Sequence, residues 1–462
     1  MERNDFKGKK ITVLGLGLHG GGVGIIRFLS EAGARLTVTD LKSEEELQPS
    51  LEKLADIEGV EYVLGRHCED DFATADMVVK NPGVPWTNSY IQLALEKGVA
   101  VEIDSSLFFK LCKNKIIGVT GTRGKTTTAS LIYEILRAAG KNPIKVGIGQ
   151  VSVLDKLNDV KDDAIVVFEL SSWRLSALGR YGLSPEIAVL TNVFQDHLNY
   201  YRDMEEYLAD KKYIYSSQKT TDFCVVNWDD ERLMGLDSGI GSQVIGFSQH
   251  SLDQDRAVYV EQGAIYSRHE GNMEKIIDLA EIKIKGAHNI SNILASVGVA
   301  QALHIDAQTI RKGILAFTGL PHRLEFVREL DGVKYYNDTA ATSPDGAISG
   351  IQSFTESIVL ISGGSDKNLV MTELAQVIKE KIQKIVFLQG AGTDKIISAL
   401  RAGGRNEEFQ VVDSMDAAVA RAKEIAVSGE VILLSPGTAS FGLFLNEFDR
   451  GDKFKKIVKE LS

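Results

Sequence analysis

The chain has 462 residues, a length that favours about three domains. Its apolar fraction of 44% and charged fraction of 25% are those of ordinary globular proteins. The formal net charge of −11 excludes a general binder of nucleic acid or anionic membranes, because such surfaces need an excess of basic side chains. An anionic ligand therefore has to be held by local positive groups and helix ends.

The cysteines and the hydropathy pattern bear on the compartment. Cys68, Cys112 and Cys224 are too widely spaced for a disulfide framework or a metal motif, and they fit a reducing environment. The N-terminus lacks the apolar core of a signal peptide, and no stretch approaches the ~20 apolar residues of a membrane span. We therefore expect a cytoplasmic protein that contacts neither membrane nor nucleic acid.

The first glycine-rich unit lies at residues 10–40. Its pattern predicts a strand over 10–14, a tight turn GLGLHG, a helix over 23–32 and a strand that ends at Asp40. This is the dinucleotide-binding fingerprint, with an acid placed to contact a ribose hydroxyl. Taken alone it favours an NAD-dependent dehydrogenase, but the same turn serves any ligand held at the end of a strand.

The first domain continues with a regular alternation of elements and is predicted to span residues 1–107. Short strands at 61–64 and 76–79 are followed by the turn Asn81-Pro82-Gly83. A helix over 89–97 and a strand over 99–103 complete a small α/β sheet.

The second glycine-rich unit, GVTGTRGKTTT at residues 118–128, is the strongest local motif of the chain. A short apolar strand precedes it, and apolar residues at helical spacing follow it. Strand, turn and helix in this order point backbone N–H groups at a phosphate, with Lys125 on the terminal phosphates and the Thr126 hydroxyl on Mg²⁺. Strict Walker spacing requires glycine where Val119 stands, so the loop is a variant. The alternative is a plain glycine-rich turn before a helix.

The central domain is predicted to span residues 108–319. Strands near 164–168, 187–190 and 223–226 are followed by polar residues, which face the ligand crevice in a parallel sheet. Three polar sets stand out at such positions: Glu169 with Ser171-Ser172, Asn192 with Asp196-His197, and Lys211-Lys212. Short alternating segments follow at 244–247, 257–260 and 264–267, and residues 286–292 open a helix.

The last part of the chain, residues 320–462, alternates strand and helix again and is predicted to form a third α/β domain. The expected strands are 334–337, 357–361, 384–388, 410–412 and 431–434. Glycines punctuate the strand ends, and no long or proline-rich linker separates the domains. The fold class expected for the whole chain is therefore α/β with three domains.

Eight motifs in order resemble those of the Mur ligases. They are GVTGTRGKTT, ELSSWRL, NVFQDHLNYY, GAHNISN, LPHRLE, YYNDTAATSP, GGSDKNL and the pair LLSPGTASF with NEFDRGDKF. The resemblance covers essentially the whole chain. It implies a UDP-binding Rossmann-like domain, a central P-loop ATPase domain and a C-terminal Rossmann-like domain. The opening GLGLHG unit and the tail are most similar to the members that add D-glutamate to UDP-N-acetylmuramoyl-L-alanine.

The resemblance implies an ATP-dependent ligase of peptidoglycan precursor synthesis that forms an acyl phosphate and then an amide. Small-molecule substrates, ATP, two Mg²⁺ ions and a monomeric state follow from it. The phosphates would be held by residues 121–127, namely Gly121, Thr122, Arg123, Gly124, Lys125, Thr126 and Thr127. Thr126 and Glu169 would ligate one Mg²⁺, and His197 would be a ligand or polar contact of the second. Lys211 matches the carbamylated lysine that supports this second metal, although adjacent Lys212 leaves the assignment open by one residue.

Further positions match those at which the family contacts the adenine and ribose or closes the nucleotide site: Asn289, Asn292, His322, Arg323 and Asp338. Simpler interpretations stay open for some residues. His288-Asn289 would then be only a helix N-cap, Glu169 a solvated residue at a strand end, and Asp196-His197 a loop pair without a ligand.

The outer domains match the family's two other substrate sites. The UDP-sugar contacts correspond to Leu18, His19, Asp40, Asn81, Pro82 and Gly83. The amino-acid contacts correspond to Thr342, Lys367 and Ser440, with a solvated surface lysine as the alternative for Lys367.

The chain departs from the family pattern mainly in the amino-acid pocket. Ala340 replaces a usual lysine, and Glu447 stands where a phenylalanine is expected, with Phe448 next to it. Gly147 replaces a usual asparagine, and Arg123 replaces the usual loop asparagine. The reaction type is hardly affected by these changes, whereas the identity and stereochemistry of the added residue stay open.

Three other classes explain less of the chain. A dehydrogenase accounts only for the first forty residues, and a GTPase-like or motor protein only for residues 118–128. A catalytically silent scaffold is disfavoured by Lys125, Glu169 and His197. Within the family, a ligase for L-glutamate or another amino acid is the serious alternative.

Overall fold

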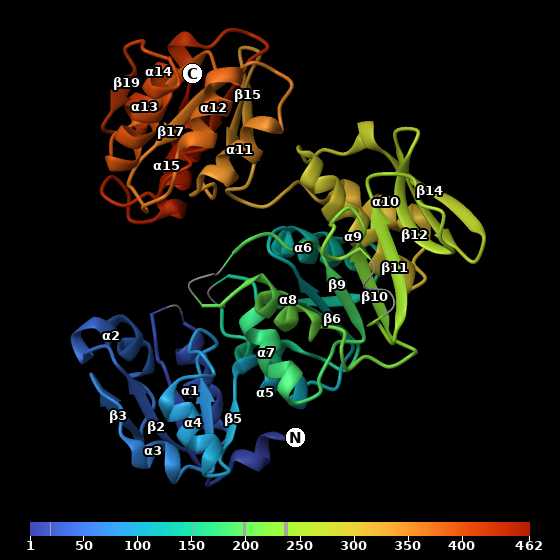
Figure 1. Ribbon diagram of the computed structural model, residues 1–462, viewed down its shortest axis with the longest axis vertical. Coiled ribbons are helices and arrows are strands. Elements are labelled where there is room, and N and C mark those ends of the chain that lie inside the picture. Colours follow the sequence, from blue (N-terminus) through green and yellow to red (C-terminus); the bar gives the residue numbers. More distant parts are fainter. Residues whose placement is uncertain (19, 150, 197–199, 235–238) are drawn as a thin grey trace. The chain divides into compact units, whose positions relative to one another are not determined.

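The computed structural model describes residues 1–18, 20–149, 151–196, 200–234 and 239–462. The chain divides into two compact units, one made of residues 1–281 and 290–316 and the other of residues 282–289 and 317–462. The first unit contains two sheets and the second contains one (Figure 1). The predicted α/β fold class with three sheet domains is confirmed, whereas the boundaries at 107 and 319 stay a prediction.

The first domain is a five-stranded parallel sheet in the order β3-β2-β1-β4-β5. Its strands are β1 (Lys10–Leu14), β2 (Arg35–Asp40), β3 (Val60–Leu64), β4 (Met77–Lys80) and β5 (Ala100–Glu102). Its helices are α1 (Gly21–Glu31), α2 (Glu44–Leu51), α3 (Glu69–Ala73), α4 (Ser89–Glu96) and α5 (Asp104–Leu111), with short 3-10 turns at Arg3–Phe6 and Glu52–Leu54. Because β1 and β4 are neighbours, their carboxyl ends bring the glycine turn and the Asn81 turn together.

The central domain is built on a nine-stranded sheet in the order β14-β13-β12-β11-β10-β9-β6-β8-β7. Its strands are β6 (Ile116–Thr120), β7 (Asn142–Val146), β8 (Ala164–Glu169), β9 (Ile187–Leu190), β10 (Phe223–Asn227), β11 (Gln243–Ser248), β12 (Arg256–Glu261), β13 (Ala264–His269) and β14 (Asn272–Asp278). Its helices are α6 (Lys125–Ala138), α7 (Ser172–Arg180), α8 (Met204–Lys212), α9 (Ala287–Ala302) and α10 (Ala307–Ala316), with 3-10 turns at Leu154–Asp159 and Leu279–Glu281.

The central sheet has two parts with different pairing. Strands β6 to β12 run parallel, whereas β12, β13 and β14 pair antiparallel and extend the sheet away from β6 (Figure 1). In the parallel part, β6 and β9 are buried on both faces along their whole length. The predicted central strands are confirmed, and the structure adds β7 and β14.

The C-terminal domain is a six-stranded sheet in the order β15-β16-β20-β17-β18-β19. Its strands are β15 (Glu325–Leu330), β16 (Val333–Asn337), β17 (Ile358–Gly363), β18 (Lys384–Leu388), β19 (Gln410–Val412) and β20 (Val431–Leu434). Its helices are α11 (Pro344–Gln352), α12 (Thr372–Lys381), α13 (Ala391–Ala402), α14 (Met415–Ile425) and α15 (Glu447–Glu460). Only β15 pairs antiparallel.

Two apolar clusters cover the two faces of this last sheet. Leu360 packs into one cluster, and its neighbours Val359 and Ile361 pack into the other. This alternation follows from the two-residue period of a strand with helices on both faces.

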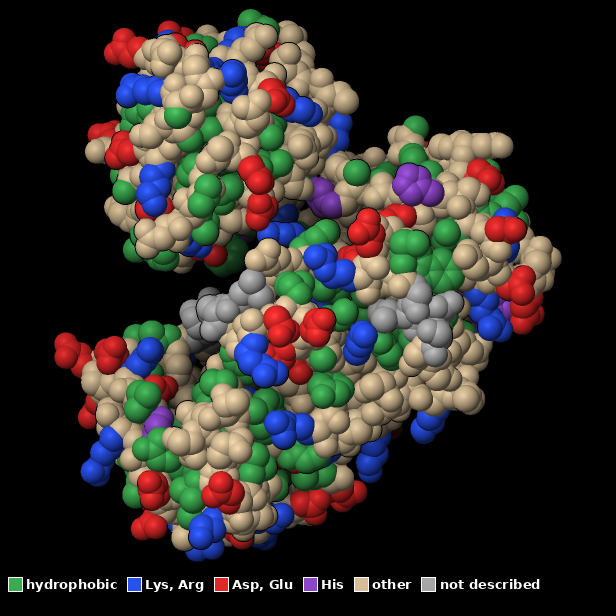
Figure 2. Space-filling model, viewed as in Figure 1, with side chains coloured by type: hydrophobic (Ala, Val, Ile, Leu, Met, Phe, Trp, Pro, Cys, Tyr) green, Lys and Arg blue, Asp and Glu red, His purple; other side chains and the backbone are tan. Residues whose placement is uncertain are grey.

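On the face shown in Figure 2, acidic and basic side chains are interspersed. Within the described residues, no helix is both long and apolar enough to cross a membrane.

Candidate active site

The phosphate loop connects β6 to α6, and two of its glycines are required by close packing. Gly121 has φ 150°, and a Cβ there would lie 1.9 Å from the Thr191 Oγ1. Gly124 has φ 82° at the N-cap of α6, and a Cβ there would lie 2.3 Å from the Asn292 Oδ1. A larger residue at either place would be strained and would displace its neighbour. The glycine spacing therefore reflects the shape of the loop.

Lys125 and Arg123 are both tied to the fold around the loop. The Lys125 amine donates to the Gly121 carbonyl at 3.0 Å and to the Thr122 carbonyl at 2.9 Å. The Arg123 backbone N–H donates to the Asn192 Oδ1 at 2.8 Å. The side chain of Lys125 thus curls over its own loop, at the positive end of α6.

The structure brings together Thr126 and Glu169, the two residues that were predicted to ligate the first of the two Mg²⁺ ions. The Thr126 hydroxyl donates to the Glu169 Oε2 at 2.7 Å, from the first turn of α6 to the end of β8. A hydroxyl and a carboxylate are the hard oxygen donors that Mg²⁺ prefers, with phosphate and water oxygens completing the shell. Among the described residues no cluster of three His, Cys, Asp or Glu side chains could hold a metal alone. The residues present fit a Mg²⁺ ion that is bound together with a nucleotide.

Lys211 lies directly beneath the phosphate loop. It is 1% exposed at the end of α8, and its amine donates to the Gly121 carbonyl at 3.0 Å, the same oxygen that Lys125 uses. Burial and the nearby Lys125 charge hold the pKa of Lys211 well below its usual value, while Asp196 and Asp210 raise it by a smaller amount. Lys212 is only half-buried, so the loop contact belongs to Lys211.

Two of the predicted site histidines cannot be placed. His19 and His197 lie outside the described residues. The neighbour of His197, Asp196, is close enough to influence the pKa values of Lys211 and Tyr207. The described part of the NVFQDH segment, residues 192–196, therefore ends close to Lys211.

The residues predicted to contact adenine and ribose fall in both compact units. Asn292 belongs to the first unit, where its Oδ1 accepts a bond from the Thr128 hydroxyl at 3.2 Å. Asn289, Arg323 and Asp338 belong to the second unit. The Asn289 amide donates to the Lys285 carbonyl at 2.6 Å. Their common role at the nucleotide stays a prediction.

Asp338 is buried and held inside the second unit. Its carboxylate accepts bonds from the Ser435 hydroxyl at 2.8 Å and from the Leu324 N–H at 3.2 Å. Burial raises the pKa of Asp338 to about 7, against the effect of these two donors. His322 lies nearby on the Asn337 side chain at 3.1 Å.

The glycine turn of the first domain is closed by Asp40. The Asp40 carboxylate accepts bonds from the Gly17 N–H and the Lys42 N–H, both at 3.0 Å. The Asn81 N–H donates to the Leu14 carbonyl at 2.7 Å, and the Asn81 side chain accepts from the Gly83 N–H at 3.0 Å. Pro82 lies between them, and Leu18 is 42% exposed in the turn. The two predicted UDP-sugar turns therefore lie side by side.

Lys80, which ends β4 beside this turn, was not among the predicted site residues. Lys80 is fully buried, and its amine donates to the Val84 carbonyl at 2.7 Å and lies 4.5 Å from the Trp86 ring. Burial lowers the pKa of Lys80 to about 7, although the Asp104 charge raises it in part. A buried apolar strand that ends in lysine before Asn-Pro-Gly is the signal that could have found it.

The predicted amino-acid contacts lie together in the C-terminal domain. The Lys367 amine lies 3.5 Å from the Thr342 hydroxyl. Ser440 is 3% exposed and follows Ala439, which pairs with Ser365 in the Lys367 loop. Phe448 is half-exposed, with its ring 5.4 Å from that of His322.

Arg450 is a further residue that the sequence did not single out. It is fully buried in α15, and its guanidinium donates to the Thr339 hydroxyl at 2.9 Å and the Thr339 carbonyl at 3.0 Å. It also donates to the Ala439 carbonyl at 3.2 Å. Arg450 thus fixes the two segments that carry Thr342 and Ser440.

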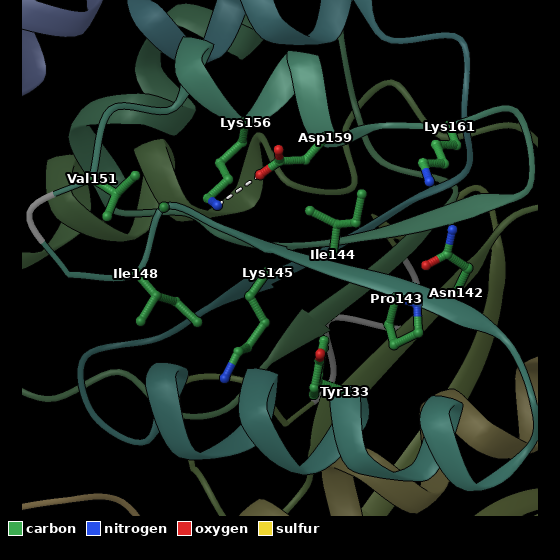
Figure 3. Close-up of a pocket in the computed structure, with 11 residues that line it drawn as sticks. Tyr133, Asn142, Pro143, Ile144, Lys145, Ile148, Val151, Lys156, Asp159 and Lys161 are labelled. Carbon is green, nitrogen blue, oxygen red and sulfur yellow. Dashed lines mark hydrogen bonds and ion pairs between the residues drawn. The ribbon is translucent and has the colours of Figure 1, made fainter.

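A cavity of about 530 Å³ lies along β7, the outermost strand of the central sheet (Figure 3). Its lining residues are Tyr133, Asn142, Pro143, Ile144, Lys145, Gly147, Ile148, Val151, Lys156, Asp159 and Lys161. Lys156 is paired with Asp159 at 2.8 Å, and Lys145 lies 4.8 Å from the Tyr133 ring. None of the predicted ATP, metal or substrate residues lines this cavity.

Family models match each of the three domains. The model described as the Mur ligase MurD-like N-terminal domain matches residues 9–102, the Mur ligase middle domain matches residues 119–300, and the Mur ligase glutamate ligase domain matches residues 322–437. The chain belongs to the Mur ligase family, and it is an ATP-dependent ligase.

Curated relatives are similar over their full length. The UDP-N-acetylmuramoylalanine--D-glutamate ligase of Roseiflexus sp. (strain RS-1) is 39% identical, over 98% of this chain and 99% of its own. The protein of the same name from Borreliella afzelii is 39% identical over all of both chains. That from Clostridioides difficile is 36% identical over 99% of this chain and all of its own.

Solved structures show the same fold at lower identity. The MurF ligase of Thermotoga maritima in complex with ADP has a TM-score of 0.60 at 17% identity, covering 99% of this chain and 97% of its own. The UDP-N-acetylmuramate-alanine ligase MurC of the same organism has a TM-score of 0.58 at 20% identity, covering 98% and 99%. The predicted three-domain Mur ligase architecture is confirmed.

Proposed function

We propose that this chain joins D-glutamate to UDP-N-acetylmuramoyl-L-alanine at the expense of ATP, in the synthesis of a peptidoglycan precursor. The observation that carries the proposal is the full-length similarity, at 35–39% identity, to ligases of that name. We further propose that it acts in the cytoplasm, as a monomer, on small-molecule substrates only.

The proposed reaction has two steps. The alanine carboxylate attacks the γ-phosphorus of ATP, so that an acyl phosphate forms and ADP leaves. The glutamate amine then attacks the acyl carbon, a C–N bond forms, the amine loses a proton, and phosphate leaves from a tetrahedral intermediate. The part of the protein is to position the groups and to neutralise crowded negative charge.

Lys125, the loop backbone and the Thr126–Glu169 pair are the proposed ATP-binding groups. When the γ-phosphate is present, Lys125 exchanges its two loop carbonyls for phosphate oxygens. Thr126 and Glu169 would hold one Mg²⁺, and His197 with Lys211 would serve a second. Bound Mg²⁺ supplies charge neutralisation at the phosphate oxygens.

We propose that Lys211 is carbamylated. Its amine is buried next to Lys125, and the two share one carbonyl oxygen, so two ammonium groups would repel each other there. The neutral amine, favoured by the low pKa, is the form that adds to CO₂ with loss of a proton. The resulting carbamate is an anion that faces Lys125 and offers oxygen ligands to a metal.

The amino-acid site is proposed to read a side-chain carboxylate through Lys367, with hydroxyls from Thr342 and Ser440. Ala340 lies in the same segment and contributes no charge, so Lys367 is the cation on which glutamate depends most. Because Lys367 would contact the side chain of either enantiomer, L-glutamate is the second candidate after D-glutamate.

A phosphate-release assay with ATP, UDP-N-acetylmuramoyl-L-alanine and a panel of D- and L-amino acids tests the proposal. We expect release that requires the UDP-linked substrate and is fastest with D-glutamate. Reactions without the UDP-linked substrate or without the amino acid are the controls. Turnover with neutral or basic amino acids and none with either glutamate would refute the glutamate assignment while leaving the ligase chemistry in place.

A further inference from the structure

Helix α7 connects the predicted metal site with the first domain. It begins at Ser172, three residues after Glu169, and Ser171 caps it by accepting a bond from the Arg174 N–H at 3.4 Å. Any tilt of α7 is therefore passed to the end of β8, where Glu169 meets Thr126.

The first domain contacts α7 at both ends. In the middle of α7, the Trp86 indole N–H donates to the Ser176 hydroxyl at 2.8 Å, and at the C-terminal end the Arg180 guanidinium lies 4.1 Å from the Trp86 ring. Lys80 also lies near that ring, with its amine 4.5 Å from the centroid, and it contacts the turn after Gly83 through the Val84 carbonyl. The predicted UDP-sugar turn is thus linked to α7.

Near the N-terminal end, Arg174 forms a shielded ion pair with Asp104 of α5. The guanidinium approaches the two Asp104 oxygens at 2.9 and 3.4 Å, and the side chains are 19% and 4% exposed. The Ser105 hydroxyl donates to the Arg174 carbonyl at 3.2 Å. A planar guanidinium that contacts both oxygens of a buried carboxylate has little rotational freedom.

The same guanidinium also reaches the loop after β7. Its Nη1 lies 3.5 Å from the Gly147 carbonyl. Gly147 has φ 78° and packs so closely on β8 that a Cβ there would lie 2.5 Å from the Glu169 carbonyl. Arg174 therefore contacts the first domain and the 147–149 loop while it stands on the helix that follows Glu169.

We infer that Arg174 is a positioning residue that fixes the 147–149 loop and Glu169 relative to the UDP-binding domain. The inference rests on the proposed function and deepens it, since it names a contact that would keep the UDP-linked substrate and the ATP site correctly positioned for the reaction. Asp104 orients the guanidinium, and Gly147 receives its remaining donor. In this role Arg174 acts through Asp104 and Gly147 and not on a reacting group.

The test compares Arg174→Met, Arg174→Lys and Asp104→Asn with a matched control, Arg27→Gln, which breaks the exposed Arg27–Asp56 pair of the first domain. For Arg174→Met we expect kcat to fall by about 100-fold, the loss that a displacement of about 1 Å can cause. The KM for ATP should stay unchanged, because the phosphate loop is held by Thr191 and Asn192. The KM for the UDP-linked substrate should rise.

Two further readouts separate positioning from general stabilisation. Arg174→Lys keeps the charge opposite Asp104 but cannot contact Asp104 and Gly147 together, so Tm should recover while kcat stays low. Hydrogen exchange of the 147–149 amides, measured without substrate, should be faster in Arg174→Met than in Arg27→Gln. Should Arg174→Met fail to fold, Asp104→Asn provides the same readouts with an isosteric change.

A lower Tm with unchanged kcat, unchanged KM values and unchanged 147–149 exchange would overturn the inference. Failure of the proposed function looks different. In that case the unmodified protein releases no phosphate with any amino acid of the panel. Hydrogen exchange of the 147–149 amides then tests the positioning role without an activity assay. Faster exchange in Arg174→Met than in Arg27→Gln supports that role, and equal exchange refutes it.

Discussion

The chain contains two glycine turns of the same construction that serve different chemistry. Each joins a parallel strand to a helix whose N-cap glycine has φ 82°, Gly20 in the first domain and Gly124 in the central one. In the first, the Gly17 N–H is occupied by the Asp40 carboxylate, an acid of the neighbouring strand. In the second, the loop contains Lys125.

Each turn also has a buried lysine beside it, and the two lysines have different partners. Lys80 donates to the Val84 carbonyl within its own domain and packs on Trp86. Lys211 donates to the phosphate loop itself, in competition with Lys125. The backbone thus makes two similar anion-binding ends, and the charged side chains around them decide which one takes part in phosphoryl transfer.

The largest expected effect is that of Lys125→Ala. Removing the cation that we propose for the terminal phosphates should lower the rate of phosphate release by about 10³-fold, as the loss of a preorganised charge-stabilising donor does. Tm should change little, because the hydrogen bonds from the Lys125 amine to the Gly121 and Thr122 carbonyls lie within its own loop. Near-normal turnover in this variant would show that the two turns do not differ as proposed.

Lys211→Ala should cost less, about 10²-fold in kcat, because the group acts at one remove from the phosphates. Short carboxylates added to the assay should restore part of the rate by filling the vacant anionic position. Lys212→Ala is the matched control and should leave kcat unchanged. Mass spectrometry of active enzyme kept in bicarbonate should detect a carbamate on Lys211. An active enzyme with an unmodified Lys211 under these conditions would contradict the modification.

Lys80→Met probes the buried lysine beside the first turn. Because the pKa of Lys80 is lowered to about 7, the folded state binds fewer protons than the unfolded state between pH 7 and 10.5. The free energy of unfolding should therefore rise with pH in this window, by about 1.4 kcal/mol per pH unit at most. Chemical unfolding at several pH values measures this slope.

The Lys80→Met variant should lose that rise, and the exposed Lys53→Met variant of the same domain should keep it. Equal slopes in the wild-type protein and in Lys80→Met would mean that Lys80 keeps its proton in the folded state. A Lys80 that stays protonated beside the first turn would be able to contact an anionic ligand as a cation.

The smallest expected effect is that of Asp40→Ala on the first turn. Loss of the carboxylate removes the two charge-assisted hydrogen bonds from the Gly17 and Lys42 N–H groups that close the turn, so the KM for the UDP-linked substrate should rise by about tenfold. Titrations of both substrates check this. An equal rise in the KM for ATP would show that the first turn is not specific for the UDP-linked substrate.

Local sequence patterns determined much of the fold. Short apolar runs predicted β1, β6, β8, β9 and most C-terminal strands, because strands buried on both faces need continuous apolar residues. The strands that were missed do not have such runs. β14 begins with four exposed residues, β15 has no fully buried residue, and β7 has Pro143 and Lys145 on the outer edge of the sheet.

The sequence by itself determined the family, the phosphate loop and the chemical type of each predicted site residue. Only the tertiary structure decided which of Lys211 and Lys212 meets the loop, because burial depends on helix rotation and not on residue type. It alone revealed how deeply Lys80 is buried, and it alone brought Asp104 and Arg174 together, seventy residues apart in the chain. Contacts of this kind join residues far apart in the chain, where no local period or spacing records them.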